Sequence, residues 1–410
     1  MTYEPGQPDA PNRSTRPSLT PPDFASALAQ PRMAQGAGIA PAPTSPAAVP
    51  VKPRAGRTAP VWIIGVIVLI LIGLVGYFLN AIGPAASIIG MLLALVPLAA
   101  VLFAVRIIDR WEPEPRGLLV LAVAWGAVAA VGITLGVDLL ISLVLGADDS
   151  AARDAFSAVV QAPIVEEFAK GLGVYLIFVT ARRAFDGPID GVVYGALIGA
   201  GFAFTENIQY FAISLIEGGV VDVSTTFFVR GILSPFAHVM FTSITGFALG
   251  LAARRGAGPG RAIGPWVVGM IGATALHALW NGSAVFGDFF VLYLTLQVPL
   301  FVGFILGIIA LRREEARLTR SRLGDYAAAG WFTPQEVDML ATGAGRKAAL
   351  DWARGLRGDR TPIMKEFITD ATALAAARQR AISGRDAHAR EDEHVLLART
   401  TAARAAMFAP

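Results

Sequence analysis

The sequence predicts an all-α fold: a polytopic membrane bundle of about eight transmembrane helices with a soluble segment at each end. Of its 410 residues, 54% are hydrophobic and 16% are charged, and the mean hydropathy is +0.57. These values are too apolar for a soluble chain of this length. Apolar runs long enough to cross a bilayer recur along the chain. The chain has no cysteine, which excludes disulfides, thiol nucleophiles and thiolate metal sites.

Residues 1–59 are rich in Pro, Ala, Gly, Ser and Thr and show no sustained apolar period, so we expect a disordered cytoplasmic tail. This segment is too long and too rich in proline to be the start of a cleavable signal, and the run 61–79 therefore predicts a true first span. Lys52, Arg54 and Arg57 precede that run and predict a cytoplasmic N-terminus.

Seven further apolar runs complete the predicted membrane domain, residues 60–311. They cover about 85–105, 117–145, 157–180, 188–214, 227–253, 263–287 and 289–311. Arginines cluster after the even-numbered runs, whereas the opposite loops hold essentially only Arg153. This bias predicts a multi-pass protein of the cell membrane with both termini in the cytoplasm. The net charge of +3 is modest and concentrated near the ends, which favours contact with the lipid bilayer over nucleic-acid binding.

Residues 312–410 are soluble in character and predict a small helical cytoplasmic tail. Thr333 followed by Pro334 and Glu336 has the pattern of a helix cap, and Thr361 with Pro362 marks a second helix start. Between the second and third spans, residues 109–116 read Asp-Arg-Trp-Glu-Pro-Glu-Pro-Arg, which predicts a compact, rigid turn.

Charged residues inside the fourth apolar run are the first candidates for a functional site. The stretch 163–171 contains Glu166, Glu167 and Lys170. A charge near the bilayer centre costs about 2.5–3.5 kcal/mol on insertion scales, so such residues are functional candidates. On a helix, Glu166 and Lys170 are four apart and are expected to pair, whereas Glu167 lies about 100° around the helix and is expected to remain free as a base. The alternative is an ion-pair lock between helices.

The next three runs also carry polar side chains. Glu206 lies in the fifth run, His238 in the sixth, and His277 with Asn281 in the seventh. Their positions along the spans predict comparable depths, so four helices are expected to bring them to one polar cavity. His277 and Asn281 are one turn apart and are expected to address the same atom.

Two interpretations of this chemistry remain open. His238, His277 and Glu206 offer a ligand set for a metal such as Zn²⁺. Alternatively, Glu167 or Glu166 activates water without a metal, the two imidazoles and Asn281 stabilise an oxyanion, and Glu206 carries a proton.

At these residues the sequence resembles the PrsW family of intramembrane proteases. The motifs that carry the resemblance are the 109–115 turn, Glu166-Glu167-x-x-Lys170, Phe204-Thr-Glu206-Asn207, His238 and His277-x-x-x-Asn281. It is also distantly similar to the type II CAAX prenyl endopeptidases, which share a paired-glutamate and a His-x-x-x-Asn motif. The base follows Glu167 three positions on, as Lys170, where the prenyl endopeptidase pattern has an arginine one residue later, so a prenylated substrate is not expected. The resemblance implies a peptidase that cleaves a membrane-associated protein, in the founding case an anti-sigma factor.

Two other classes compete with an intramembrane endopeptidase. In a proton-coupled transporter, the same Glu, Lys and His residues would form a relay. The chain shows no inverted repeat and no matched pair of broken helices, the usual sequence pointers to that class. In a membrane scaffold, the charges would be interhelical locks and the tails would recruit partners.

Overall fold

The computed structural model describes residues 61–146, 150–384 and 386–408, and every regular element in these ranges is helical. The predicted all-α fold class is confirmed, while the expected disorder of residues 1–59 concerns a segment outside the described ranges. The α-helices, together with the π-helical segments labelled η, are α1 Val61–Tyr77, η1 Phe78–Ile82, α2 Pro84–Ile108, α3 Arg116–Ala124, η2 Trp125–Ala130, α4 Val131–Leu145, α5 Ala151–Phe156, η3 Ser157–Gln161, α6 Ala162–Thr180, α7 Pro188–Phe227, η4 Phe228–Leu233, α8 Ala237–Arg254, α9 Pro259–Phe286, α10 Phe289–Leu292, η5 Tyr293–Gln297, α11 Val298–Ala328, α12 Pro334–Leu340, α13 Gly343–Gly355, α14 Thr361–Ser383 and α15 Ala389–Met407.

Long apolar helices form the membrane part of the molecule. Within the described residues, six ranges are long and apolar enough to cross a membrane: Ile63–Ile82, Pro84–Ile108, Arg116–Val144, Pro188–Arg254, Pro259–Phe286 and Phe289–Ala328. The fourth range holds both α7 and α8, which pack against each other as a hairpin. Helix α6, which carries Glu166, Glu167 and Lys170, is not among the six. The bundle is therefore polytopic as predicted, and the count of eight spans stays a prediction.

A reversal at Gly219 shapes the α7–α8 hairpin. Gly219 adopts φ 66°, which a residue with a side chain rarely takes, and the chain turns back there. Ser214 and Thr226, one on each side of the turn, are joined by a hydrogen bond of 2.8 Å. The returning leg thus begins before residue 227, the expected start of the sixth span, and it breaks at residues 234–236 just ahead of His238.

Glycines at every fourth position of α7 let α8 approach closely. A Cβ atom added to Gly191 would lie 2.0 Å from the Gly246 carbonyl oxygen, and one added to Gly199 would lie 2.4 Å from the His238 carbonyl oxygen. Such small-residue stripes are a recurring way of packing helices in membranes, where apolar burial gives little driving force. This row of glycines fixes the position of His238 along the axis of α7.

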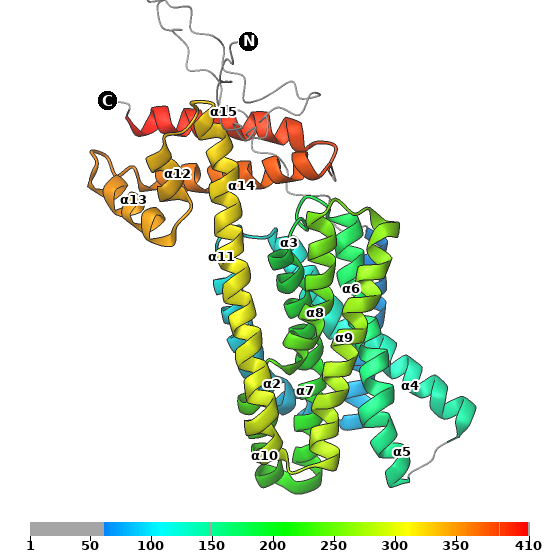
Figure 1. The fold of residues 1–410 in the computed structure, drawn as a ribbon. Coiled ribbons are helices and arrows are strands. Elements are labelled where there is room, and N and C mark those ends of the chain that lie inside the picture. The colour runs from blue at the N-terminus through cyan, green and yellow to red at the C-terminus, as the bar shows by residue number, and fades with distance from the viewer. Residues whose placement is uncertain (1–60, 147–149, 385, 409–410) are drawn as a thin grey trace, which may run out of the picture.

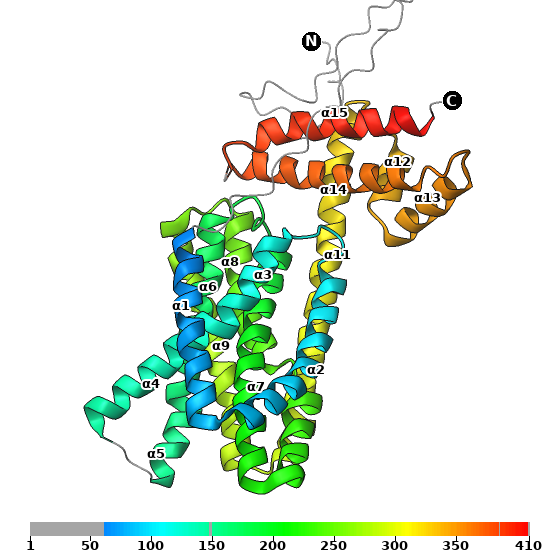
Figure 2. The same cartoon turned by 180° about the vertical axis from the view of Figure 1, so that it is seen from behind.

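The C-terminal helices pack at one end of the bundle, where α1 begins and α11 leaves it (Figures 1 and 2). Helix α11 continues without interruption past the expected boundary at 311/312 to Ala328. The end of α11 and helices α12 to α15 share a separate core that includes Leu323, Tyr326, Phe367 and Leu374. Both predicted helix starts are confirmed: Thr333 and Glu336 form a capping box, and α14 begins at Thr361.

The 109–116 turn joins the bundle to these C-terminal helices. Asp109 accepts a hydrogen bond from the Glu114 backbone N–H at 3.1 Å, as expected for a compact turn. The Trp111 indole N–H donates to Thr319 Oγ1 at 3.2 Å, and the Arg346 guanidinium lies 3.5 Å from the Trp111 ring. The turn is thus covered by the C-terminal part of the chain, a contact that the sequence reading did not predict.

Candidate active site

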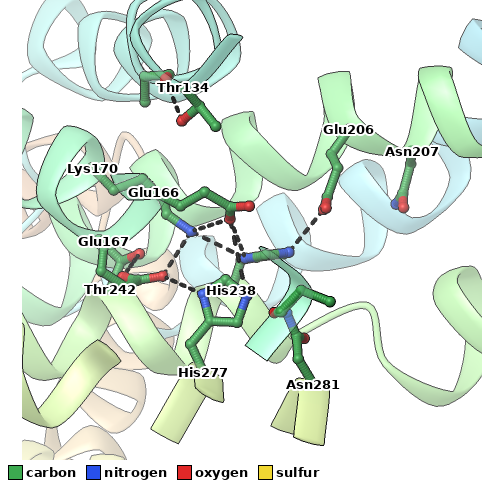
Figure 3. A network of polar contacts seen from close by, with 12 residues as sticks. Thr134, Glu166, Glu167, Lys170, Glu206, Asn207, His238, Thr242, His277 and Asn281 are labelled. Atoms are coloured by element: carbon green, nitrogen blue, oxygen red, sulfur yellow. Dashed lines mark hydrogen bonds and ion pairs between the residues drawn. The ribbon is translucent and has the colours of Figure 1, made fainter. Parts of the chain in front are cut away.

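Four helices bring the charged residues of the apolar runs to one place. Glu166, Glu167 and Lys170 come from α6, and Glu206, His238 and His277 come from α7, α8 and α9. All of them lie in one network of polar contacts (Figure 3). The expected convergence of the four helices is therefore what the structure shows.

The expected pair of Lys170 with Glu166 is present, but the expectation that Glu167 remains free is wrong. Lys170 Nζ lies 2.7 Å from Glu167 Oε1 and 3.3 Å from Glu166 Oε2, so the closer ion pair is with the residue expected to be free. Both Lys170 and Glu167 are 0% exposed. Residues three and four apart on a helix are both within reach of a long side chain, and the neighbouring helices decide between them. Here Thr242 Oγ1 donates to Glu167 Oε2 at 3.1 Å and draws it inward.

Glu166 is the carboxylate that faces both imidazoles. Its Oε2 atom lies 3.9 Å from His238 Nδ1 and 4.0 Å from His277 Nε2. Neither imidazole nitrogen makes a hydrogen bond to Glu166 at these distances. The three atoms lie within 4.8 Å of one another, close enough to share one ligand.

The other nitrogen of each imidazole contacts a second carboxylate. His277 Nδ1 lies 3.2 Å from Glu167 Oε1, and His238 Nε2 lies 2.8 Å from Glu206 Oε2. Because an ionised carboxylate only accepts, these two nitrogens are assigned the N–H, as the network requires. His277 Nε2 and His238 Nδ1 are then lone-pair acceptors turned toward Glu166. Lys170 Nζ, 3.1 Å from His238 Nδ1, already uses one of them.

Glu206 occupies a position that differs from the expected third metal ligand. It accepts a hydrogen bond from His238 Nε2, the ring nitrogen that faces away from Glu166. It also forms an ion pair with Arg230, whose Nη2 atom lies 2.5 Å from Glu206 Oε2. Arg230 Nε also donates to Asn207 Oδ1 at 2.8 Å. Glu206 therefore orients His238 from behind, as carboxylates often do for metal-binding histidines.

Asn281 is also placed differently from the expectation. Its side chain was expected to address the same atom as His277, but Nδ2 donates to the Ala158 carbonyl in η3 at 2.8 Å. Asn281 thus connects α9 to the segment that leads into α6. In the described part of the chain, no hydrogen bond joins it to the charged cluster.

The sequence reading missed Arg230 and Thr242. Arg230 is a basic residue in the apolar stretch 225–233, so the rule that singled out Glu166 and Glu167 also applies to it. Thr242 is one turn after His238 on α8 and offers only the weaker signal of a hydroxyl on the same helix face.

Two aromatic rings pack against the charged cluster. The Phe202 ring lies 4.2 Å from Lys170 Nζ, and the Phe241 ring stacks on His277 with centroids 4.8 Å apart. Excluding water from around charges strengthens the interactions among them. The charged groups of the cluster are therefore coupled, and removing one of them weakens the interactions among the others.

The donor set fits a divalent metal. Glu166, His238 and His277 are all buried, and each offers one ligand atom, with these atoms within 4.8 Å of one another. Two imidazoles and one carboxylate are a known ligand set of catalytic zinc sites, which keep a further position open. Glu167 and Glu206 bind the ring nitrogens that face away from the site, as carboxylates commonly do for metal-binding histidines.

Fold and site together define the class: a polytopic helical membrane protein with a buried carboxylate–histidine centre. A family model described as PrsW family intramembrane metalloprotease matches residues 114–304, so the resemblance stated from the motifs is confirmed. Protease PrsW of Geobacillus kaustophilus is 35% identical over 144 residues, which is 35% of this chain and 58% of that protein. Protease PrsW of Bacillus subtilis is 31% identical over 144 residues, 35% of this chain and 60% of that protein. The chain thus spans about 60% of the length of these relatives, and no solved structure is significantly similar to it.

Proposed function

We propose that this chain is an intramembrane endopeptidase that hydrolyses a peptide bond in a membrane-associated protein. One observation carries the proposal: a carboxylate oxygen of Glu166 and the acceptor nitrogens of His238 and His277 face one another inside an apolar bundle. A structural ion-pair lock needs no such set, since Lys170 and Glu167 already pair. The similarity to proteins named Protease PrsW supports the same activity.

The three facing residues are proposed to hold the metal, with Zn²⁺ as the first candidate. Both imidazoles have given their N–H to Glu167 and Glu206, so the nitrogens that face the site can ligate a metal but cannot donate to an oxyanion without gaining a proton. A zinc ion held there would supply the Lewis acidity needed to polarise a carbonyl and to make water acidic near neutral pH. Lys170 contacts two of the same donor atoms, so its ammonium and a metal compete for them.

The residues around this centre take distinct roles in the proposal. Glu166 is the carboxylate that touches the reacting group, as a ligand or as the base that accepts a proton from water. Glu167 and Glu206 are positioning residues, because each holds one imidazole in a single tautomer. Asn281 fixes α9 against η3 and so sets the position of His277, one turn earlier.

The proposed setting follows from the same observations. The chain is proposed to lie in the cell membrane with both termini on one side, because α1 begins and α11 leaves at one end of the bundle, and the arginine bias of the loops places that side in the cytoplasm. The proposed substrate is a protein with a membrane-embedded or membrane-adjacent segment. An anti-sigma factor is a specific candidate within that class.

The test is a comparison of membrane proteomes. Cells carrying the wild type and cells carrying Glu166→Gln are compared for proteins that accumulate uncut, and new termini are mapped. Glu314→Gln, an exposed change on α11, is the matched control and is expected to behave as the wild type. At least one membrane protein is expected to accumulate only with Glu166→Gln. Identical termini in all three strains, with equal amounts of folded protein, would overturn the proposal and leave a scaffold or a transporter.

A further inference from the structure

Few residues of the apolar part of α11 are buried, although Phe304 and Leu311 pack against the core of the bundle. In the range Phe289–Ala328, which contains α11, only 6% of the residues in the apolar part are buried. This is the lowest share among the six ranges that are long and apolar enough to cross a membrane. In Figures 1 and 2, α11 runs along the side of the bundle toward the C-terminal helices. Hydrogen bonds attach it near both ends: the Tyr293 hydroxyl, in the η5 segment just before α11, donates to the Leu233 carbonyl at 2.9 Å, and the Trp111 indole N–H donates to Thr319 of α11.

A groove lies between this part of α11 and helices α2, α7 and α8. Its volume is about 320 Å³. Its walls include Val101 and Ala104 of α2, Ala196 of α7 and Phe304 of α11, and every lining residue is apolar except Arg312 at one end. A cavity without polar partners does not hold ordered water. In a bilayer the groove is therefore filled by hydrocarbon.

The dimensions of the groove decide between a lipid chain and a helix. Along α11 the apolar lining runs from Phe301 to Ile309, a rise of about 12 Å. This is close to the thickness of one leaflet, about 15 Å, and far below the ~30 Å that a transmembrane segment needs. An extended acyl chain matches this length, and a transmembrane helix does not.

Arg312 supplies the polar end. It lies where α11 passes from the apolar run to the charged stretch that leads to the C-terminal helices. Within the described residues, Arg312 makes no ion pair, although Glu315 one turn later attracts it at longer range. In a phospholipid, a phosphate group lies at the end of the apolar acyl chains. A guanidinium at the end of an apolar groove is placed to bind that phosphate when an acyl chain occupies the groove.

We propose that this groove binds one anionic glycerophospholipid from the leaflet that faces the C-terminal helices, with an acyl chain along α11 and the phosphate at Arg312. The lipid fills the space between α2 and α11 and so holds α11, the helix that leads into α12–α15, against the bundle.

The test uses the full-length protein in detergent with an equimolar mixture of dioleoyl phosphatidylglycerol and dioleoyl phosphatidylcholine, measured by native mass spectrometry. Ala104→Phe fills the groove, and Ala310→Phe, on an exposed position of α11 outside it, is the matched control. Arg312→Gln removes the headgroup partner, and Arg313→Gln is the control one residue away.

The wild type is expected to retain one phosphatidylglycerol with about a fivefold preference over phosphatidylcholine, the effect of one basic residue at a membrane surface. Ala104→Phe is expected to lose that lipid at least fivefold, and Arg312→Gln to lose only the preference, while both controls match the wild type. The proposal is overturned if Ala104→Phe retains as much lipid as the wild type, or if Arg312→Gln keeps the preference. Arg312→Gln changes a side chain that makes no ion pair among the described residues. The lipid preference of this variant therefore tests the proposal even if Ala104→Phe folds poorly.

Discussion

Lys170 and Glu167, three residues apart on α6 and both fully buried, form an ion pair of 2.7 Å, the closer of the two that Lys170 makes with the adjacent glutamates. This pair assigns the two adjacent glutamates to different jobs. Glu167 has both carboxylate oxygens engaged, one by Lys170 and His277 and the other by Thr242. Glu166 Oε2, which also accepts from Lys170, faces the acceptor nitrogens of both imidazoles.

The first prediction separates these two glutamates. Glu167→Gln leaves Lys170 with a weaker partner inside the bundle, and breaking a buried pair costs about 3–5 kcal/mol. The variant should therefore melt at a clearly lower temperature in detergent. Glu166→Gln keeps the Lys170–Glu167 pair, so it should melt within a few degrees of the wild type and yet cleave nothing. Adding Lys170→Met to Glu167→Gln should recover much of the lost melting temperature. A well-folded, inactive Glu167→Gln beside an active Glu166→Gln would mean that the roles are the reverse.

A second prediction concerns Glu206 as a support for His238 rather than a ligand. Removing such an outer partner typically weakens metal binding by about 10–100-fold without changing its stoichiometry. Glu206→Gln should accordingly still bind one zinc ion, with a weaker affinity measured by competition with a chelator. His238→Ala should bind none. Complete loss of zinc from Glu206→Gln would restore the ligand role that the sequence suggested.

The third prediction tests the glycine contact behind His238. A methyl group at residue 199 would meet the His238 carbonyl oxygen at 2.4 Å, so Gly199→Ala must push α8 away from α7. We expect lower stability and at least a tenfold loss of activity, since displacements of about 1 Å in an active site can cost about a hundredfold. Gly264→Ala on α9, where no atom lies within 4 Å of the added Cβ, is the control and should have little effect. Equal behaviour of the two variants would contradict the packing argument.

How much of this site the sequence could predict depends on the kind of information each feature needs. The convergence of α6, α7, α8 and α9 was predictable because charges are costly in apolar runs and gather where they can pair. The partner of Lys170 was not, since helix geometry allows both neighbours and Thr242 on α8 decides between them. Asn281 shares a face with His277, yet the choice of Ala158 depends on how η3 packs, which no local pattern encodes.

The same distinction holds for the fold. The helix starts at Thr333 and Thr361 follow from local caps and were predicted. The reversal at Gly219 was missed, because a single glycine inside an apolar run is not enough to predict a turn. The cover over the 109–116 turn was also missed, since it depends on contacts with residues more than 200 positions away.

The fourth prediction concerns pH at the junction between the bundle and the C-terminal helices. Burial raises the pKa of the Asp109 carboxyl from 3.8 to about 6, against a smaller opposing effect of the hydrogen bond from Glu114. A carboxyl with a higher pKa in the folded chain binds more protons when folded, so its contribution to the unfolding free energy falls as pH rises from about 4 to 6. Asp109→Asn, which keeps the acceptor oxygen, should match the wild type in melting temperature at pH 4 and exceed it at pH 7. The same change at the exposed Asp351 should shift neither value. A constant difference across this pH range would contradict the assignment.

The most direct measurement of the central claim combines metal content and cleavage in the same preparations of full-length protein. The substrate is the membrane protein that accumulates uncut with Glu166→Gln, and zinc is counted per chain in the wild type, Glu166→Ala, His238→Ala and His277→Ala. We predict about one zinc ion and cleavage in the wild type, no zinc and no cleavage in the three variants, and loss of cleavage on chelation with recovery when zinc is returned. Cleavage at the full rate by wild-type protein that holds no metal would contradict the metal centre and leave Glu166 as a base without one.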